Sequence, residues 1–296
     1  MNKKFKKLLP RVRENVSLKS HNTFRIGGKA RYFFVAKNKE DLIKAITTVT
    51  DLKLPLFVLG NGSNLLISDK GFKGLVIKIK NQKSKIKNNL ICVEAGVSLG
   101  QLVNIASKNN LTGLEWAIGI PGTVGGAIAG NAGAFNKSIG ENVSGVEVYD
   151  VRNKRIKIFK IKNCKFSYRE SIFKKNRNLI IISVKLRLNK GNKEKIKQKM
   201  KAYLNHRIET QPLKLPSIGS IFKNSKGFFA AELIEKCGLK GKKVEDVKIS
   251  EKHANFIVNL GKGKARDVVK LISLIKKKVK GKFGVILEEE IIYLGF

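Results

Sequence analysis

Cysteine and histidine are scarce in this chain of 296 residues, which contains three of each. The six residues lie far apart in the sequence: His21, Cys92, Cys164, His206, Cys237 and His253. No CxxC pair occurs, so the spacing excludes a zinc site or a disulfide framework and favours reduced thiols in the core of a cytoplasmic protein. The histidines are too scattered to indicate a metal site, and we expect no metal.

Long apolar runs are also missing. The basic start, MNKKFKKLLPRVRENV, is not followed by an apolar segment, so we expect no export signal. The single candidate for a membrane span is residues 119–135, but its glycines, Pro121 and Asn131 make a poor helix, and it falls short of about 20 strongly apolar residues. The sequence therefore predicts no membrane insertion.

Acidic residues are few, with 22 Asp and Glu against 61 Lys and Arg, which gives a formal net charge of +39. A cluster of such charge could neutralise nucleic-acid phosphates. The lysines instead recur on nearly every predicted surface, aromatic residues make up 7%, and no nucleic-acid-binding motif is present. We expect a solvated basic surface that attracts anionic substrates, and no specific binding of nucleic acid.

The segments with clear periodicity alternate between helix and strand. Helices are predicted at 38–55, starting at the N-cap Asn38, and at 97–110, starting at Ser98. Further helices are expected at 190–207, 228–238 and 265–284, and strands at 54–60, 144–151, 154–161, 178–188, 253–260 and 285–296. This order predicts an α+β fold with mixed sheets and a boundary between units near residue 190.

Two glycine-rich stretches are candidates for ligand binding. GNGSN, residues 60–64, follows a predicted strand, and its glycines would let backbone N–H groups approach a pyrophosphate, although a plain turn fits as well. It lacks the third glycine of the GxGxxG motif, so a standard Rossmann site is disfavoured. Residues 119–135 hold six glycines and four alanines without a charge, which suits either a flat ring such as isoalloxazine or close packing of two backbone segments.

Three polar clusters could supply chemistry. FSYRES places Arg169 beside Tyr168, a pair suited to a carboxylate or phosphate, although a surface ion pair is the alternative. Ser220 lies in a loop between Gly219 and Ile221, where its hydroxyl could donate a proton or simply form a turn.

The third cluster is LEEEIIYLG near the end of the sequence. In a strand, Glu288 and Glu290 would share one face and Glu289 the other, and the apolar neighbours indicate that one face is buried. A buried carboxylate there needs a partner or a function.

Taken together, these segments resemble the UDP-N-acetylenolpyruvoylglucosamine reductase family, in its shorter form. The resemblance runs through HNTFRIGGKARYF, VLGNGSNLLISDKGFKGLVI, GLEWAIGIPGTVGGAIAGNAGAF, CKFSYRESIFK, QPLKLPSIGSIFKN, SEKHANFIVN and LEEEIIYLG. It implies an FAD-binding fold of the vanillyl-alcohol-oxidase type, with subdomains at 1–80 and 81–190, and an α+β substrate-binding domain at 191–296. The last strand would return Glu290 to the active site.

The resemblance also assigns residues to a non-covalently bound FAD. Those expected to contact the cofactor are Gly60, Asn61, Gly62, Ser63, Asn64, Gly119, Ile120, Pro121, Gly122, Thr123, Gly125, Gly126 and Ala127. NADPH is expected as hydride donor and UDP-N-acetylglucosamine enolpyruvate as substrate. The chain is expected to act as a cytoplasmic monomer in peptidoglycan precursor synthesis.

The implied catalytic residues are Arg169, Ser220 and Glu290, with Tyr168 and Asn224 as substrate-binding residues. Arg169 would stabilise developing negative charge, Ser220 would donate the proton, and Glu290 would assist at the carboxylate. The alternative is an FAD-dependent sugar or alcohol oxidase of the same fold. It would share the flavin motifs but lack the motifs that contain Arg169, Ser220 and Glu290. The chain departs from the family pattern in the following places: Ser225, Glu245-Asp246 and Ile292.

Overall fold

The computed structural model describes residues 3–225 and 227–296, and its contacts divide the chain into two compact units. Unit 1 comprises Met1–Glu14, Tyr32–Asn61 and Gly74–Asn205. Unit 2 comprises Asn15–Arg31, Gly62–Lys73 and His206–Phe296. Neither unit is continuous in sequence, because two early segments group with the last third of the chain.

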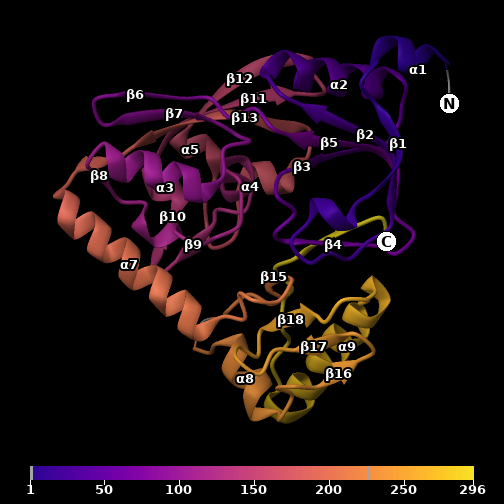
Figure 1. Cartoon of the computed structure of the whole chain (residues 1–296), viewed down its shortest axis with the longest axis vertical. Helices are drawn as coiled ribbons and strands as arrows, with labels where there is room; N and C mark the ends of the chain where they lie inside the picture. Colours follow the sequence, from indigo (N-terminus) through magenta and orange to yellow (C-terminus); the bar gives the residue numbers. More distant parts are fainter. Residues whose placement is uncertain (1–2, 226) are drawn as a thin grey trace. The chain divides into compact units, whose positions relative to one another are not determined.

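The helices vary from single turns to long segments, and Figure 1 follows them along the chain. The α-helices are α1 (Lys3–Leu8), α2 (Lys39–Asp51), α3 (Leu99–Lys108), α4 (Val124–Ala129), α5 (Ile161–Cys164), α6 (Ile172–Lys175), α7 (Lys193–Thr210), α8 (Ala230–Lys236) and α9 (Ala265–Phe283). Short 3₁₀ helices are η1 (Lys19–His21), η2 (Glu115–Ala117) and η3 (Ile139–Asn142).

The strands are mostly short. Those before residue 100 are β1 (Arg13–Ser17), β2 (Lys29–Ala36), β3 (Leu56–Leu59), β4 (Leu65–Ile67), β5 (Phe72–Ile79), β6 (Ser84–Lys87) and β7 (Leu90–Glu94). The middle of the chain has β8 (Leu111–Thr112), β9 (Gly133–Ala134), β10 (Lys137–Ser138), β11 (Val143–Asp150), β12 (Arg155–Lys160), β13 (Leu179–Arg187) and β14 (Asn189–Lys190). The last are β15 (Ser217–Ser220), β16 (Lys243–Val244), β17 (Val247–Ile249), β18 (Phe256–Asn259) and β19 (Ile292–Leu294).

Unit 1 is built around an antiparallel sheet of order β12-β11-β13-β7-β6. The short helix α4 packs on β13 and β7, and α3 packs on α4. In α3 the buried residues are Leu99, Leu102, Val103 and Ala106, which join the same apolar core as the sheet. This packing fixes the glycine-rich stretch of α4 against the end of β7.

The order β1-β2-β5-β3 describes a second, four-stranded sheet. Its β3 and β5 are parallel, and their register places Leu59 beside Lys78. The helix α2 contributes Leu42, Ile46 and Val49 to the core of unit 1. Because β3 ends at Leu59, the GNGSN motif begins directly at this end of the sheet.

Unit 2 contains an antiparallel sheet of order β15-β18-β17-β16, and α9 packs on β16, β17 and α8. A separate parallel pair joins β4 to β19, with Leu65 opposite Ile292. Phe24, Ile26 and Leu66 from the two early segments lie in the same apolar core as Ile218 and Phe222. The early segments are therefore part of the core of unit 2.

Several predicted elements are confirmed. The helices at α2 and α3 begin after the predicted caps, with the Asn38 side chain accepting from the Asp41 amide and Ser98 forming a capping box with Gln101. The strand predicted at 285–296 is wrong over most of its length, because only Ile292–Leu294 pairs as a strand. The three-part domain division stays a prediction. The last change from one compact unit to the other falls at residues 205/206, inside α7.

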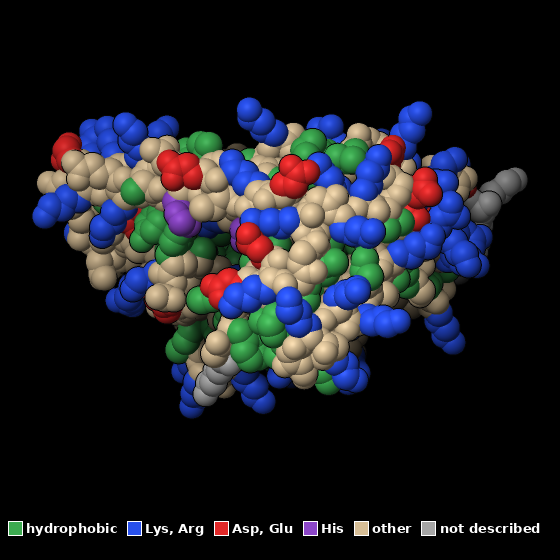
Figure 2. Space-filling view, turned by 90° about the horizontal axis from the view of Figure 1, so that it is seen from below, with side chains coloured by type: hydrophobic (Ala, Val, Ile, Leu, Met, Phe, Trp, Pro, Cys, Tyr) green, Lys and Arg blue, Asp and Glu red, His purple; other side chains and the backbone are tan. Residues whose placement is uncertain are grey.

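Basic side chains are spread over the surface. Figure 2 shows Lys and Arg across the whole of the face that it presents, with Asp and Glu between them, rather than gathered in one stripe. This distribution agrees with the sequence interpretation of a solvated basic surface.

Candidate active site

The first residues of the GNGSN loop closely contact the other glycine-rich segment of unit 1. A Cβ added to Gly60 would lie 2.4 Å from Oγ1 of Thr123, and the Asn61 side-chain amide donates to the Gly122 carbonyl at 3.4 Å. The structure thus brings together the first two residues of the loop and the middle of the 119–135 stretch. Four of the residues predicted to bind FAD meet at this contact.

The 119–135 stretch is anchored by backbone hydrogen bonds. The amides of Val124 and Gly125 donate to the carbonyls of Val97 and Ala95, at 2.8 and 2.9 Å. A Cβ on Gly125 would lie 2.9 Å from the Cβ of Ala95, so this glycine serves close packing. The N-cap of α4 is Thr123, whose Oγ1 accepts from the Gly126 amide at 3.3 Å.

The remaining small residues of this stretch leave backbone open to a ligand. Gly119, Pro121 and Gly126 are exposed, and a Cβ on Gly126 would meet only Thr123 within 4 Å. Ile120 is half-buried, whereas Ala127 points into the core. Close backbone packing therefore explains Gly125, whereas the open backbone at Gly119, Pro121 and Gly126 is free to contact a ligand.

The GNGSN loop has backbone amides that are left open. Among the described residues, no amide from Asn61 to Asn64 donates to a backbone carbonyl or a side chain, and all four residues are half-buried. Gly62 has φ of 65°, and a Cβ there would lie 2.7 Å from the Cβ of Asn22, so Ser63 and Asn64 follow a turn that glycine favours. Consecutive unsatisfied amides are what an anionic group requires, so the loop suits the diphosphate of FAD.

The turn that carries Arg169 is rigid. Ser167 and Glu170 exchange two backbone hydrogen bonds of 3.1 Å, so Tyr168 and Arg169 occupy the tip, and Arg169 has φ of 57°. The guanidinium donates to the Gly133 carbonyl at 2.8 Å and lies 5.4 Å from the centre of the Tyr168 ring. In unit 1, Arg169 is therefore held against the end of the glycine-rich stretch.

Two supporting residues of this turn were not predicted from the sequence. Buried Asn131 donates to the Ser167 carbonyl at 2.8 Å and accepts from the Gly140 amide at 3.1 Å. Ser171 donates to the Ala129 carbonyl at 2.6 Å and caps α6. An asparagine inside an otherwise apolar glycine-rich run was the available signal, since a buried amide needs partners.

Unit 2 brings Ser220 and Glu290 together. Ser220 ends β15, directly after Gly219 with φ of 78°, and the amide of Glu290 donates to the carbonyl of the next residue, Ile221, at 2.8 Å. The Asn64 side chain donates to the Glu290 carbonyl at 3.1 Å. The GNGSN motif thus fixes the backbone of Glu290, while Arg169 belongs to unit 1.

The three glutamates do not lie on the two faces of a strand as predicted. Residues 288–290 are held by isolated backbone hydrogen bonds to 221–223 and by a single bridge between Phe222 and Glu289. Glu288 is exposed and pairs with Lys223 at 2.5 Å. Glu289 and Glu290 are both partly buried, and Glu289 accepts from Lys276 at 2.8 Å and from the Tyr293 hydroxyl at 2.5 Å.

The substrate-binding candidates lie in different units. Asn224 of unit 2 accepts the Ala230 amide at 3.1 Å, at the start of α8. Tyr168 of unit 1 is 54% exposed, which leaves its ring reachable by a ligand.

Two of the departures from the family pattern have a visible structural setting. Ile292 lies in β19, and its amide donates to the Asn64 carbonyl at 3.0 Å, so the backbone contact does not depend on its side chain. Glu245 adopts φ of 48°, a left-handed conformation that glycine takes more readily.

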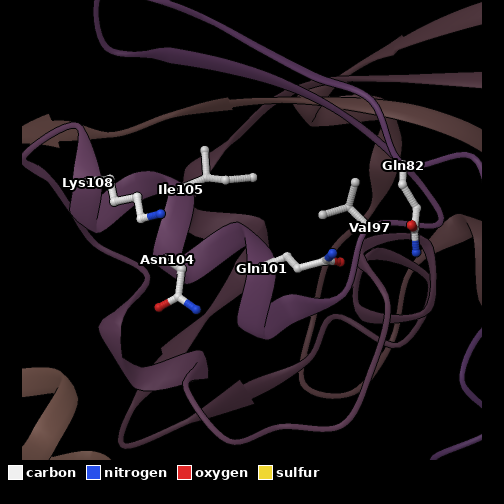
Figure 3. Close-up of a pocket in the computed structure, with 6 residues that line it drawn as sticks. All are labelled: Gln82, Val97, Gln101, Asn104, Ile105 and Lys108. Atoms are coloured by element: carbon white, nitrogen blue, oxygen red, sulfur yellow. The ribbon is translucent and has the colours of Figure 1, made fainter.

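A separate groove lies on the solvent side of α3. Gln82, Gln101, Asn104 and Lys108 line it with Val97 and Ile105, and Figure 3 shows four of these residues on the helix α3 and Val97 and Gln82 beyond the end that carries Gln101. The side-chain oxygen Oε1 of Gln101 already accepts hydrogen bonds from the backbone amide and the hydroxyl of Ser98. The polar side chains of the groove are exposed, and none of its lining residues is a predicted site residue, so the groove is not part of the candidate site.

Residues 3–225 and 227–296 contain no group of three or more His, Cys, Asp or Glu arranged to hold a metal ion. None of the helices in these residues has the length and apolar character to cross a membrane.

Comparisons with known proteins agree with the geometry of both units. Residues 30–158 match the FAD binding domain, and residues 211–294 match the C-terminal domain of UDP-N-acetylenolpyruvoylglucosamine reductase. The UDP-N-acetylenolpyruvoylglucosamine reductase of Caldanaerobacter subterraneus subsp. tengcongensis is 44% identical over 282 residues, 95% of this chain and 93% of the relative. That of Caldicellulosiruptor saccharolyticus is 45% identical over 283 residues, 94% of this chain and 90% of the relative.

Solved structures give the same result. The crystal structure of the reductase from Thermus caldophilus superimposes with a TM-score of 0.83 at 35% identity, covering 96% of this chain and 99% of the other. The fold is α+β, with an FAD-binding domain and a reductase C-terminal domain. The chain belongs to the UDP-N-acetylenolpyruvoylglucosamine reductase family.

Proposed function

We propose that this protein is an NADPH-dependent flavoenzyme that reduces the enolpyruvyl group of UDP-N-acetylglucosamine enolpyruvate to the lactyl ether of UDP-N-acetylmuramate, in peptidoglycan precursor synthesis. The observation that carries the proposal is similarity over nearly the whole chain, 44% identity across 95% of its length to a reductase of that name. The alternative, a sugar or alcohol oxidase of the same fold, has no observation in its favour.

The cofactor would be held by the two glycine-rich segments. The amides of Asn61 to Asn64 would bind the pyrophosphate, and the open backbone at Gly119, Pro121 and Gly126 would lie against the ring system. Bound FAD supplies hydride transfer, from NADPH to the enolpyruvyl carbon. No covalent link is needed, because backbone donors and small side chains hold the group.

Three side chains would manage the charge and the proton of the reduction. Arg169, already aimed by Gly133 and the rigid turn, stabilises negative charge that develops on the enolpyruvyl group and its carboxylate. Ser220 donates a proton to the carbon next to the one that receives hydride. Glu290, whose backbone is fixed on both sides by Ile221 and Asn64, assists at the same carboxylate.

The first experiment is an anaerobic absorption measurement on the purified protein. A yellow protein should bleach on addition of NADPH and regain its colour only when UDP-N-acetylglucosamine enolpyruvate is added. A colourless protein that cannot be reconstituted with FAD would refute the proposal. Bleaching by a sugar or an alcohol, without NADPH, would instead establish the oxidase.

Variants separate the two half-reactions. Ser220→Ala should bleach with NADPH at the rate of the unmodified protein but regain colour about a hundredfold to ten-thousandfold more slowly with substrate, which is the usual contribution of a positioned proton donor. Ser217→Ala, on the same strand, is the matched control and should change neither rate. Equal reoxidation rates in the two variants would contradict the role given to Ser220.

Glu290→Gln tests the third catalytic residue in the same way. The matched control is Glu288→Gln, two residues earlier, whose carboxylate is 70% exposed and pairs with Lys223. Reoxidation should slow in Glu290→Gln alone. A similar effect in both variants would indicate that the charge of the segment matters, and not a specific carboxylate.

Oligomeric state and location complete the proposal. We expect a monomer. We also expect a cytoplasmic location, because a reducing compartment keeps cysteines such as these three as free thiols. Light scattering coupled to gel filtration tests the first statement, and a mass corresponding to two or more chains would refute it.

A further inference from the structure

Lys78 has an unusual environment for a lysine. It lies on β5 of unit 1 beside Leu59, its side chain is partly buried, and its Nζ donates to the Gly60 carbonyl at 2.5 Å. Among the described residues no carboxylate pairs with it. Burial, together with the nearby charge of Lys80, lowers the pKa of Lys78 to about 8. Lysines are rarely buried without an acidic partner, so the placement of Lys78 calls for a function.

The hydrogen bond of Lys78 fixes the direction of one peptide group. In a trans peptide the C=O and N–H point in opposite directions. Because the Gly60 carbonyl points to Lys78, the amide of Asn61 points to the opposite side, away from β5. That amide is the first of the consecutive donors from Asn61 to Asn64.

The same peptide group is confined from a second direction. The Cα of Gly60 lies so close to Thr123 that an added Cβ would be 2.4 Å from its Oγ1, and the Asn61 side chain bonds to the Gly122 carbonyl. Lys78 on one side and the 122–123 backbone on the other leave the 60–61 peptide little freedom to flip.

We propose that Lys78 is a positioning residue for the cofactor diphosphate: its ammonium orients the Gly60–Asn61 peptide so that the amides of the GNGSN loop face the pyrophosphate, and it adds a positive charge behind them. The inference rests on the proposed function, since it takes FAD as the ligand. The partner chemistry is the diphosphate group, and the flavin ring is not involved. A bound pyrophosphate would in turn favour the charged form of the lysine.

The test measures the FAD dissociation constant of apoprotein, by quenching of flavin fluorescence, for the unmodified protein and three variants. Lys78→Met should weaken FAD binding about tenfold to a hundredfold, the usual effect of removing a group that orients the residues contacting a ligand, because the Gly60–Asn61 peptide loses its orienting donor and the diphosphate loses a nearby positive charge. Lys78→Arg, which keeps charge and donors, should recover most of the affinity. Lys80→Met, an exposed lysine two residues along the chain, should bind FAD as the unmodified protein does.

Competition by ADP separates a diphosphate role from a general structural one. Lys78→Met should lose ADP affinity by the same factor as FAD affinity, while its apoprotein remains folded at the temperature of the binding assay. FAD binding within about twofold of the unmodified protein would refute the inference, as would an arginine variant that folds but binds as weakly as methionine. A lower unfolding temperature in both Lys78 variants, in step with lost binding, would also refute it.

The outcome for the proposed function is read separately. If the unmodified protein binds no FAD, the flavoenzyme proposal fails. If it binds FAD and Lys78→Met binds equally well, only the positioning role of Lys78 fails.

Discussion

The contact between Gly60 and Thr123 allows a quantitative prediction about the cofactor-binding segments. In Gly60→Ala the new Cβ would lie 2.4 Å from Oγ1 of Thr123, well inside van der Waals contact. The φ of Gly60 is not in the left-handed region, so the cost of alanine is steric and not conformational. The threonine must move, and its hydrogen bond to the Gly126 amide at the start of α4 is then lost.

The magnitude follows from these two effects. Overpacking costs about 1–3 kcal/mol, and loss of a helix N-cap costs about 1 kcal/mol. Gly60→Ala should therefore lower the free energy of unfolding by about 2–4 kcal/mol, and Thr123→Ala by about 1 kcal/mol. In the double variant Oγ1 and Cγ2 of Thr123, the two nearest atoms, are gone, and Cβ of residue 123 is 3.5 Å away. The double variant should thus be at most a few tenths of a kcal/mol less stable than Thr123→Ala.

Urea unfolding of the four apoproteins, followed by tryptophan fluorescence and by circular dichroism, measures this cycle. The double variant should be more stable than Gly60→Ala alone, and the difference between the double variant and the sum of the two single variants gives a coupling energy of about 2–4 kcal/mol. Additive effects of the two substitutions would refute the reasoning, because they would mean that the alanine does not meet Thr123.

Three further predictions concern unit 1 thiols and the surroundings of Glu290. At pH 8 a thiol reagent should modify exposed Cys92 rapidly and buried Cys164 only on unfolding, because burial raises the pKa of Cys164 to about 11; equal labelling by mass spectrometry would contradict this. Asn64→Ala removes the hydrogen bond to the Glu290 carbonyl and should lower the unfolding free energy by about 0.5–1.5 kcal/mol, which chemical denaturation would detect. Burial, aided by Glu289, raises the pKa of Tyr293 above its unfolded value of 10.0, so the stability that this hydroxyl provides is complete below pH 10 and is lost as the pH rises further. The stability difference between the unmodified protein and Tyr293→Phe should therefore shrink above pH 10, and a constant difference would refute the assignment.

The parts of the fold that the sequence predicts correctly are those that local chemistry determines. The start of α2 depends on Asn38 and an amide three residues away, at 2.7 Å, and the capping box of α3 joins Ser98 to Gln101. Both signals lie within one turn of helix, so they can be read without knowledge of the rest of the chain. The same holds for the alternating strands β11 to β13.

The parts that could not be predicted depend on pairing over long distances in sequence. The pattern of 285–296 is apolar enough for a strand, yet Glu288 and Glu290 bond to 221–223 only at isolated positions, and the ladder begins at Ile292 against Leu65. No local sequence pattern indicates that Ile292 pairs with Leu65. Lys78 is a further example, because a lysine in a strand reads as a solvent-facing residue until the end of β3 is placed beside it.

The discontinuity of unit 2 has a consequence for biosynthesis. Segments 15–31 and 62–73 leave the ribosome early, but the sequence that completes their core, from 206 onward, is translated last. Until then Phe24, Ile26 and Leu66, which are almost fully buried in the finished molecule, have no native partners from that part of the chain. Nascent chains halted before residue 206 should accordingly expose apolar surface and recruit chaperones, while the loop that begins at Gly60 waits for β19 to fix its far end.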